Sequence, residues 1–275
     1  TYYTNYGYLI DIGAPGAGEW YPPFAGVYSQ ERNILSLKAA NCGSMCNEKL
    51  IVGTNYVRLA GTSMAAPHAA GLAALLLAKQ PTMVNEDVRQ ILRATADPIV
   101  YPGSDVYTGR LYSGAGRINA AKALAIADVP KLHISSPTYG TTVRPDSGNL
   151  TITGTASGPG FTKYELLYGR GILPSVWTSL EGPVTTQITN GVLGTLPLAD
   201  LTSDLYVIKL VVTTASGLTF SEIVVITIEP SSTQVTTQED NQTFASTDGD
   251  NIIWLDSRNG CCDVYYYSLG TGTEY

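Results

Sequence analysis

The chain has 275 residues, room for about two domains, and its net charge of −7 argues against a nucleic-acid partner. Charged residues make up only 14% of the chain, and 18 tyrosines accompany 4 phenylalanines, a composition that favours an extracellular, β-rich protein. The longest apolar run, residues 69–78, is too short to span a bilayer and predicts a core helix instead.

Residues 1–16 predict a loop, a short buried strand and a Pro-Gly turn, and two further strands are expected at Ile34–Leu37 and Tyr56–Leu59. Between these strands, Cys42 and Cys46 flank a short glycine-containing turn. A local disulfide is one interpretation of this pair in a secreted protein, and two free thiols are the other. The four cysteines of the chain do not show the spacing of a zinc site.

Three helices are predicted in the next part of the chain, over residues 63–79, 85–96 and 119–127. The first is apolar on nearly every face, which predicts that it is buried in a large core. The second has two acidic residues in its first turn, where they favour a helix start. Residues 97–112 show little pattern and predict a surface loop.

Ser63 stands at the start of the first predicted helix, directly after Gly61 and Thr62. A serine in this position commonly caps free backbone N–H groups. The same position suits a nucleophile, because free N–H groups and the helix dipole stabilise negative charge that develops there. The position alone therefore allows two interpretations, a capping serine and an acyl-transfer nucleophile.

Residues 61–71 read GTSMAAPHAAG, and this string resembles the nucleophile motif of the subtilisin-like serine proteases, the subtilases, with Ala69 in place of the common Val. Residues 5–16 and 114–120 resemble two further segments of the same family. The resemblance covers residues 1–128 and implies the C-terminal part of an α/β, three-layer subtilisin-like domain.

For the site, the resemblance implies that Ser63 is the catalytic nucleophile and that Thr62 and the backbone N–H of Ser63 contribute to the oxyanion site. A serine nucleophile also needs a histidine base and an orienting carboxylate, which precede the serine in subtilases. His68 would face away from Ser63, about 140° around the helix, and is expected to be a core residue. His133 begins the next predicted domain.

We therefore expect the aspartate, the histidine and the oxyanion asparagine to lie upstream of Thr1. The chain would then be a C-terminal fragment of a secreted protein whose signal peptide also lies upstream. The fragment alone is expected to be inactive.

Helical spacing ends near residue 128, where alternating apolar and polar residues begin. About seven short strands with turn residues between them predict an all-β, immunoglobulin-like or fibronectin-like sandwich over residues 129–230. No catalytic set appears there. A packing or spacer module is one interpretation, and binding of carbohydrate or protein is the other.

Residues 231–275 resemble one incomplete blade of the Tol-type β-propeller repeats, with two strands joined by Arg258-Asn259-Gly260. Asp248 and Asp250 are interpreted as part of a hairpin turn, because further ligands do not follow at calcium-loop spacing.

The sequence thus predicts part of a secreted serine endopeptidase that hydrolyses peptide bonds through Ser63. Its expected partners are a protein or peptide substrate, with no nucleic acid and no membrane span. No cofactor is identifiable from the residues, and calcium enters only through the resemblance. The main alternative is a secreted adhesion or scaffold protein with an inactive protease domain. In a third interpretation, binding by the β modules is the main function and proteolysis serves maturation.

Overall fold

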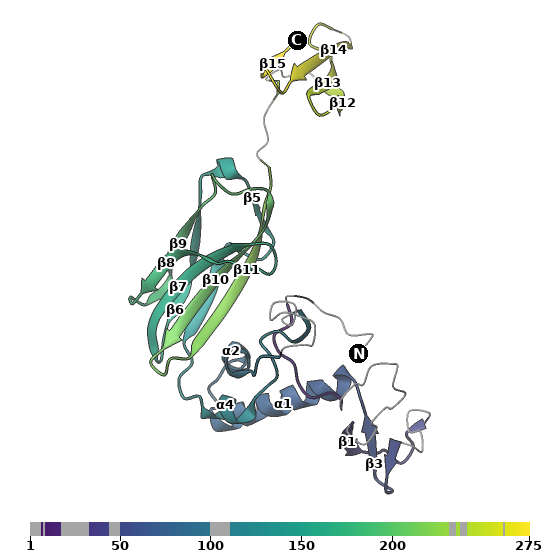
Figure 1. The fold of residues 1–275 in the computed structure, drawn as a ribbon, viewed down its shortest axis with the longest axis vertical. Coiled ribbons are helices and arrows are strands. Elements are labelled where there is room, and N and C mark those ends of the chain that lie inside the picture. Colours follow the sequence, from purple (N-terminus) through teal and green to yellow (C-terminus); the bar gives the residue numbers. More distant parts are fainter. Residues whose placement is uncertain are drawn as a thin grey trace. The chain divides into compact units, whose positions relative to one another are not determined.

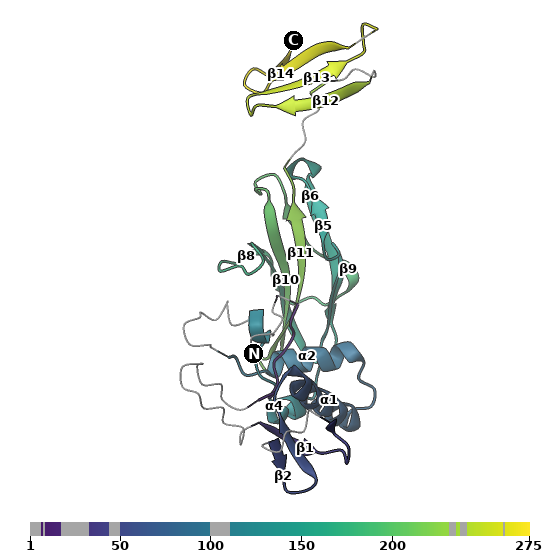
Figure 2. The same ribbon diagram turned by 90° about the vertical axis from the view of Figure 1, so that its right-hand side faces the viewer.

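The computed structural model describes residues 7, 9–17, 33–43, 50–99, 111–230, 235–236, 241–260 and 262–275. The fold is mostly β-sheet with few helices (Figures 1 and 2). It divides into two compact units, Thr1–Glu229 and Pro230–Tyr275. Residues on both sides of the boundary predicted near residue 128 lie in the first unit, and that boundary stays a prediction.

Among the described elements, the first part of the larger unit contains a small antiparallel sheet of order β1-β3-β2 and the helices α1, α2 and α4. Their bounds are β1 Ile34–Leu37, β2 Ile51–Val52, β3 Tyr56–Leu59, α1 Thr62–Lys79, α2 Asn85–Thr95 and α4 Ala120–Ala125. The predicted strands and helices are confirmed to within two residues at each end. The strand predicted within residues 1–16 is wrong for the described residues, which form only isolated bridges from Ile12 and Gly13.

Helix α1 is apolar all round, but only Leu72 and Leu76 on it are buried. These residues are four apart and share one helix face, which packs against α2 and α4. Leu75 and Leu77 are 54% and 40% exposed. The predicted burial of α1 in a large core is therefore wrong, because the two shorter helices cover only one of its faces. None of the described helices has the length and apolar character needed to cross a membrane.

Helix α2 connects the helices to the larger sheets. Its residues Val88, Ile91 and Leu92 are buried at helical spacing. At its start, the Asp87 carboxylate accepts a hydrogen bond of 3.1 Å from the backbone N–H of Val84, which satisfies one of the free donors of the first turn. Helix α2 contacts α1, α4 and strand β11, and both views show it between the helices and the sheets (Figures 1 and 2).

Eight strands follow α4 and form two sheets that enclose one core. Their bounds are β4 Lys131–Ser136, β5 Thr141–Val143, β6 Asn149–Ser157, β7 Phe161–Arg170, β8 Thr178–Val184, β9 Ile188–Pro197, β10 Asp204–Thr214 and β11 Thr219–Ile228. One sheet has the order β4-β6-β9, and the other has the order β5-β11-β10-β7-β8. Alternate residues of β10 point into the core, where Ile208 and Leu210 are completely buried. The same apolar cluster continues to Leu76 of α1.

The second unit is a four-stranded antiparallel sheet in sequence order. Its strands are β12 Gln242–Thr247, β13 Asn251–Asp256, β14 Asp263–Ser268 and β15 Thr273–Glu274. The hairpin predicted around Arg258-Asn259-Gly260 is confirmed, since β13 pairs with β14 across it. The turn interpretation of Asp248 is also confirmed, because its carboxylate accepts backbone N–H bonds from Asp250 and Asn251.

A buried carboxylate organises this second unit. Asp256 is 1% exposed and accepts hydrogen bonds from the indole N–H of Trp254 and from the backbone and guanidinium of Arg258. The hydrogen bonds from Arg258 hold the pKa of Asp256 well below its usual range. Arg258 also pairs with Glu274 at 2.6 Å and lies 3.9 Å from the ring centroid of Tyr265, so one guanidinium links three strands.

We predict that Leu76→Ala lowers the free energy of unfolding by about 2–5 kcal/mol, because it leaves a cavity where side chains are closely packed. Leu75→Ala, on an exposed face of the same helix, should change it by no more than about 0.5 kcal/mol. Urea unfolding followed by helical circular dichroism measures both values. Equal losses in the two variants would contradict the one-sided burial of α1.

We predict that Asp256→Asn destabilises the second unit at neutral pH and that its difference from the wild type shrinks in acid. A depressed folded-state pKa adds stability above the unfolded-state value of about 3.9, and this stability is lost as the pH falls toward the folded-state pKa. Thermal unfolding followed by the indole N–H signal of Trp254 between pH 7 and pH 2.5 measures the difference. A difference that does not change with pH would disprove the role of the ionised carboxylate.

Candidate active site

The first turn of α1 is positioned by two glycines that approach each other closely. The backbone N–H of Gly61 donates to the carbonyl of Gly16 over 2.8 Å. Gly61 has φ 146°, which other residues rarely adopt. A Cβ on Gly16 would lie 2.6 Å from the carbonyl oxygen of Gly61. The segment before Ala17 therefore lies against the start of the helix that carries Ser63.

Thr62 and Ser63 are exposed at this start. The N–H groups of Met64 and Ala65 point to the carbonyl of Gly61 at 3.0 and 3.3 Å. Among the described residues, the N–H groups of Thr62 and Ser63 have no hydrogen-bond partner, and the Ser63 hydroxyl has none either. The Ser63 side chain does not cap the helix, and the first turn carries no acidic residue. Two free donors thus stand at the positive end of an 18-residue helix.

Neither histidine of the chain serves Ser63 as a base. His68 is exposed, and its Nδ1 lies 2.8 Å from the carbonyl oxygen of Met64. The prediction of a core histidine is wrong, because the face of α1 that carries His68 is not covered. Nδ1 of His133 lies 3.2 Å from Oε1 of Glu222. Burial raises the pKa of that carboxyl, and His133 opposes the change.

The other two segments that carry the subtilase resemblance pair with each other through the backbone. The N–H of Gly13 donates to Gly116 over 2.7 Å, and the N–H of Ile118 donates back to Gly13 over 2.9 Å. Gly116 has φ 129°, and a Cβ there would lie 2.1 Å from the carbonyl oxygen of Asp97. The close approach requires glycine, which explains why a glycine-rich turn precedes α4.

Charged side chains attach the same segment to α2. The carboxylate of Asp11 accepts a hydrogen bond of 3.0 Å from Nε of Arg89, and its other oxygen lies 3.6 Å from Nε of Arg93. The structure thus brings all three family-like segments together around α1 and α2. Within the described residues, no group of three or more His, Cys, Asp or Glu side chains is placed to hold a metal ion.

Sequence reasoning missed a cavity between α2 and the sheet of β10 and β11, whose lining includes Arg93, Lys209 and Trp177. No sequence motif includes Arg93. What distinguishes it from other helical arginines is the cavity that it lines, and this cavity exists only in the folded protein. The alternation in β10 predicts that Lys209 faces away from the core between the two sheets. It does not predict that another element covers that face.

Residues 1–130 match the subtilase family. Subtilisin-like protease 5 of Arthroderma benhamiae is 33% identical over 115 residues, which cover 42% of this chain and 22% of that protein. The cell wall-associated protease of Bacillus subtilis (strain 168) is 30% identical over 145 residues, or 46% of this chain and 13% of that protein. This chain therefore spans less than a quarter of the length of these relatives.

Among solved structures, fervidolysin from Fervidobacterium pennivorans, a keratinolytic enzyme related to subtilisin, aligns with 86% of this chain and 44% of its own. The sequence identity is 14% and the TM-score 0.32. The family match of residues 1–130 is to the subtilases, the subtilisin-like serine proteases.

Proposed function

We propose that this chain is part of a secreted serine endopeptidase in which the hydroxyl of Ser63 attacks the peptide bond. The observation that carries the proposal is the pair of free N–H groups at Thr62 and Ser63, beside an exposed hydroxyl at the start of α1. The match of residues 1–130 to the subtilase family supports the same chemistry.

In this mechanism, Oγ of Ser63 forms a bond to the carbonyl carbon of the substrate while a base removes the hydroxyl proton. The oxyanion that develops accepts a hydrogen bond from the N–H of Ser63, and Thr62 contributes a secondary donor. The amine leaves with a proton returned by the base, and water then hydrolyses the acyl-enzyme.

We propose that the base, its orienting carboxylate and the oxyanion asparagine come from outside residues 1–275. The chain has only two histidines. His68 lies against the carbonyl of Met64, and His133 pairs with Glu222. Neither histidine is therefore available to Ser63.

For the β modules, we propose an immunoglobulin-like or fibronectin-like sandwich over residues 129–230 and an incomplete blade of a Tol-type β-propeller over residues 231–275. The division of strands into β4-β6-β9 and β5-β11-β10-β7-β8 supports the first assignment. The four-stranded antiparallel sheet of the second unit supports the other. Their proposed role is to hold a carbohydrate or protein ligand near the protease or to act as spacers.

We propose a location outside the cell for this protein. Cys42 is disulfide-bonded, and disulfides persist in oxidising, extracellular compartments. Its predicted partner, Cys46, lies outside the described residues, so the pairing stays a prediction. The name of the cell wall-associated relative agrees with this location.

The alternative function is a secreted scaffold or adhesion protein with an inactive protease domain. The observation that favours it is the lack of any hydrogen-bond partner for the Ser63 hydroxyl among the described residues. A base next to Ser63 in the full-length protein would rule this alternative out.

We predict that the 275-residue chain alone hydrolyses no peptide. It supplies the nucleophile without a base, and in subtilisin the loss of the base alone costs roughly a million-fold in turnover. Incubation with a fluorogenic peptide library and with a fluorophosphonate probe tests this prediction. Stoichiometric labelling of Ser63 in the isolated chain would mean that a base is present within it.

We predict that Ser63→Ala in the full-length protein abolishes fluorophosphonate labelling and peptide hydrolysis. Thermal stability should hardly change, because the Ser63 side chain makes no cap hydrogen bond. The matched control is Ser36→Ala, which removes another exposed serine hydroxyl and should keep full labelling. If Ser63→Ala keeps its activity, Ser63 is not the nucleophile.

A further inference from the structure

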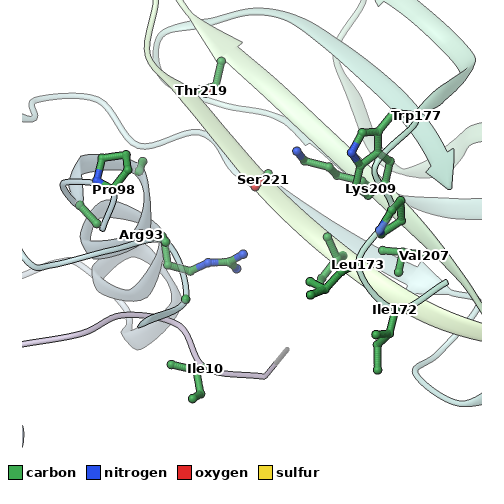
Figure 3. Close-up of a pocket in the computed structure, with 16 residues that line it drawn as sticks. Ile10, Arg93, Pro98, Ile172, Leu173, Trp177, Val207, Lys209, Thr219 and Ser221 are labelled. Atoms are coloured by element: carbon green, nitrogen blue, oxygen red, sulfur yellow. The ribbon is translucent and has the colours of Figure 1, made fainter. Parts of the chain in front are cut away.

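A cavity of about 390 Å³ lies between α2 and the outer face of the sheet formed by β10 and β11. This volume is near the lower end of the range of about 300–1,000 Å³ for small-molecule sites. Figure 3 shows side chains from both sides turned toward it, Arg93 from the helix and Leu173 and Lys209 from the side of the sheet.

The side chain of Arg93 points into this cavity (Figure 3) and is only 18% exposed. The one ion pair that it makes within the described part of the chain is the 3.6 Å contact of Nε with Asp11, a carboxylate that Arg89 already holds at 3.0 Å. Among the described residues, the Arg93 guanidinium makes no hydrogen bond. Burial, and then the charge of Arg89, lower the pKa of Arg93. The Arg93 guanidinium therefore loses most of its contact with water, and the contact with Asp11 replaces only part of the lost hydration energy.

A second cation lies on the opposite wall. The ammonium group of Lys209 lies 5.1 Å from the ring centroid of Trp177, within the range of a cation–π contact. Among the described lining residues, Arg93 and Lys209 are the only charged ones, and none is acidic. Both cations attract an anion placed between them, and the nearby carboxylates of Asp11, Glu86 and Glu222 offset part of that attraction at Arg93.

Most of the other lining residues have apolar side chains, and Thr219 and Ser221 add hydroxyls. The loop between β7 and β8 supplies Leu173 and Trp177 and folds closely over the sheet. Gly169 permits this fold, because a Cβ there would lie 2.4 Å from Cβ of Pro174. The loop that carries the apolar wall therefore lies directly against strand β7.

We propose that this cavity binds a ligand in which a carboxylate is attached to an apolar group, with the carboxylate on the guanidinium of Arg93. A guanidinium donates two parallel hydrogen bonds to a carboxylate. The apolar part of the ligand lies against Leu173 and Trp177. Two sources provide this chemistry, the C-terminus of a peptide with an apolar last residue and a free organic acid.

The site is separate from the proposed chemistry at Ser63, which does not line the cavity. It needs neither a base nor a nucleophile, so it can be tested in the 275-residue chain. Its failure would leave the proposed peptidase untouched, and a failure of the peptidase would leave the site untouched.

The test is titration calorimetry of the full chain with two acids and their amides. N-acetyl-leucyl-phenylalanine and its C-terminal amide represent the peptide source, and 3-phenylpropionate and 3-phenylpropanamide represent the free acid. We expect at least one acid to bind about ten-fold or more tightly than its amide, because only the acid forms the charged hydrogen bonds. The tighter of the two acids identifies the source.

Arg93→Met should weaken binding of that acid about ten-fold or more. Arg170→Met is the matched control, because Arg170 is an exposed arginine that pairs with Asp204 outside the cavity, and it should bind normally. Ser63→Ala should also bind normally. If Arg93→Met does not fold, the comparison of acid and amide in the wild type still tests whether the cavity binds a carboxylate.

The proposal is overturned if acid and amide bind equally well, or if none of the four probes binds. It is also overturned if a folded Arg93→Met keeps the affinity of the wild type. Inorganic phosphate that binds as tightly as the better acid would show a general anion site and would overturn the assignment of an apolar carboxylate.

Discussion

The close backbone approach of Gly16 to Gly61 is the constraint on which the site depends. It allows a hydrogen bond of 2.8 Å between the two residues, and a side chain on Gly16 would prevent it. The same segment pairs through Gly13 with the glycine-rich turn at Gly116. Three stretches that are far apart in the sequence thus fix where α1 begins. Because Ser63 is in the first turn of α1, its position is set by backbone contacts and not by its own side chain.

Helix α2 joins the segments around Ser63 to the rest of the larger unit. One of its faces buries Ile91 in the apolar cluster that includes Leu76 of α1. Its polar residues make the connections on other faces: Asp87 pairs with Lys131 of β4, and Arg89 pairs with Asp11. Both contacts join α2 to segments that are distant in sequence. A single amphipathic helix therefore determines the position of the segment beside Ser63 and forms one wall of the cavity near Arg93.

The sequence predicted the helices well because their signals are local. Asn119 accepts a hydrogen bond from the backbone N–H of Lys122 at the start of α4, and helix α2 follows the spacing of its apolar residues. The exposure of Leu75 and His68 could not be predicted, because burial depends on which elements cover a helix. The apolar pattern of α1 indicates only that several of its faces could be buried. The surroundings of Arg93 could not be predicted either, since they include residues of strands more than 100 residues later in the chain.

The two candidate sites share one physical feature, polar groups that the described part of the chain leaves without hydrogen bonds. At Ser63 these are backbone N–H groups, which are exposed and can be solvated by water, so their cost in the free protein is small. At Arg93 the group is a charged side chain that is largely buried, so water compensates it less. An anion that binds at Arg93 would therefore gain more binding energy, because the guanidinium is already charged and poorly solvated. At Ser63 the N–H groups stabilise negative charge only when it develops during a reaction. This difference separates a site built for binding from one built for a transition state.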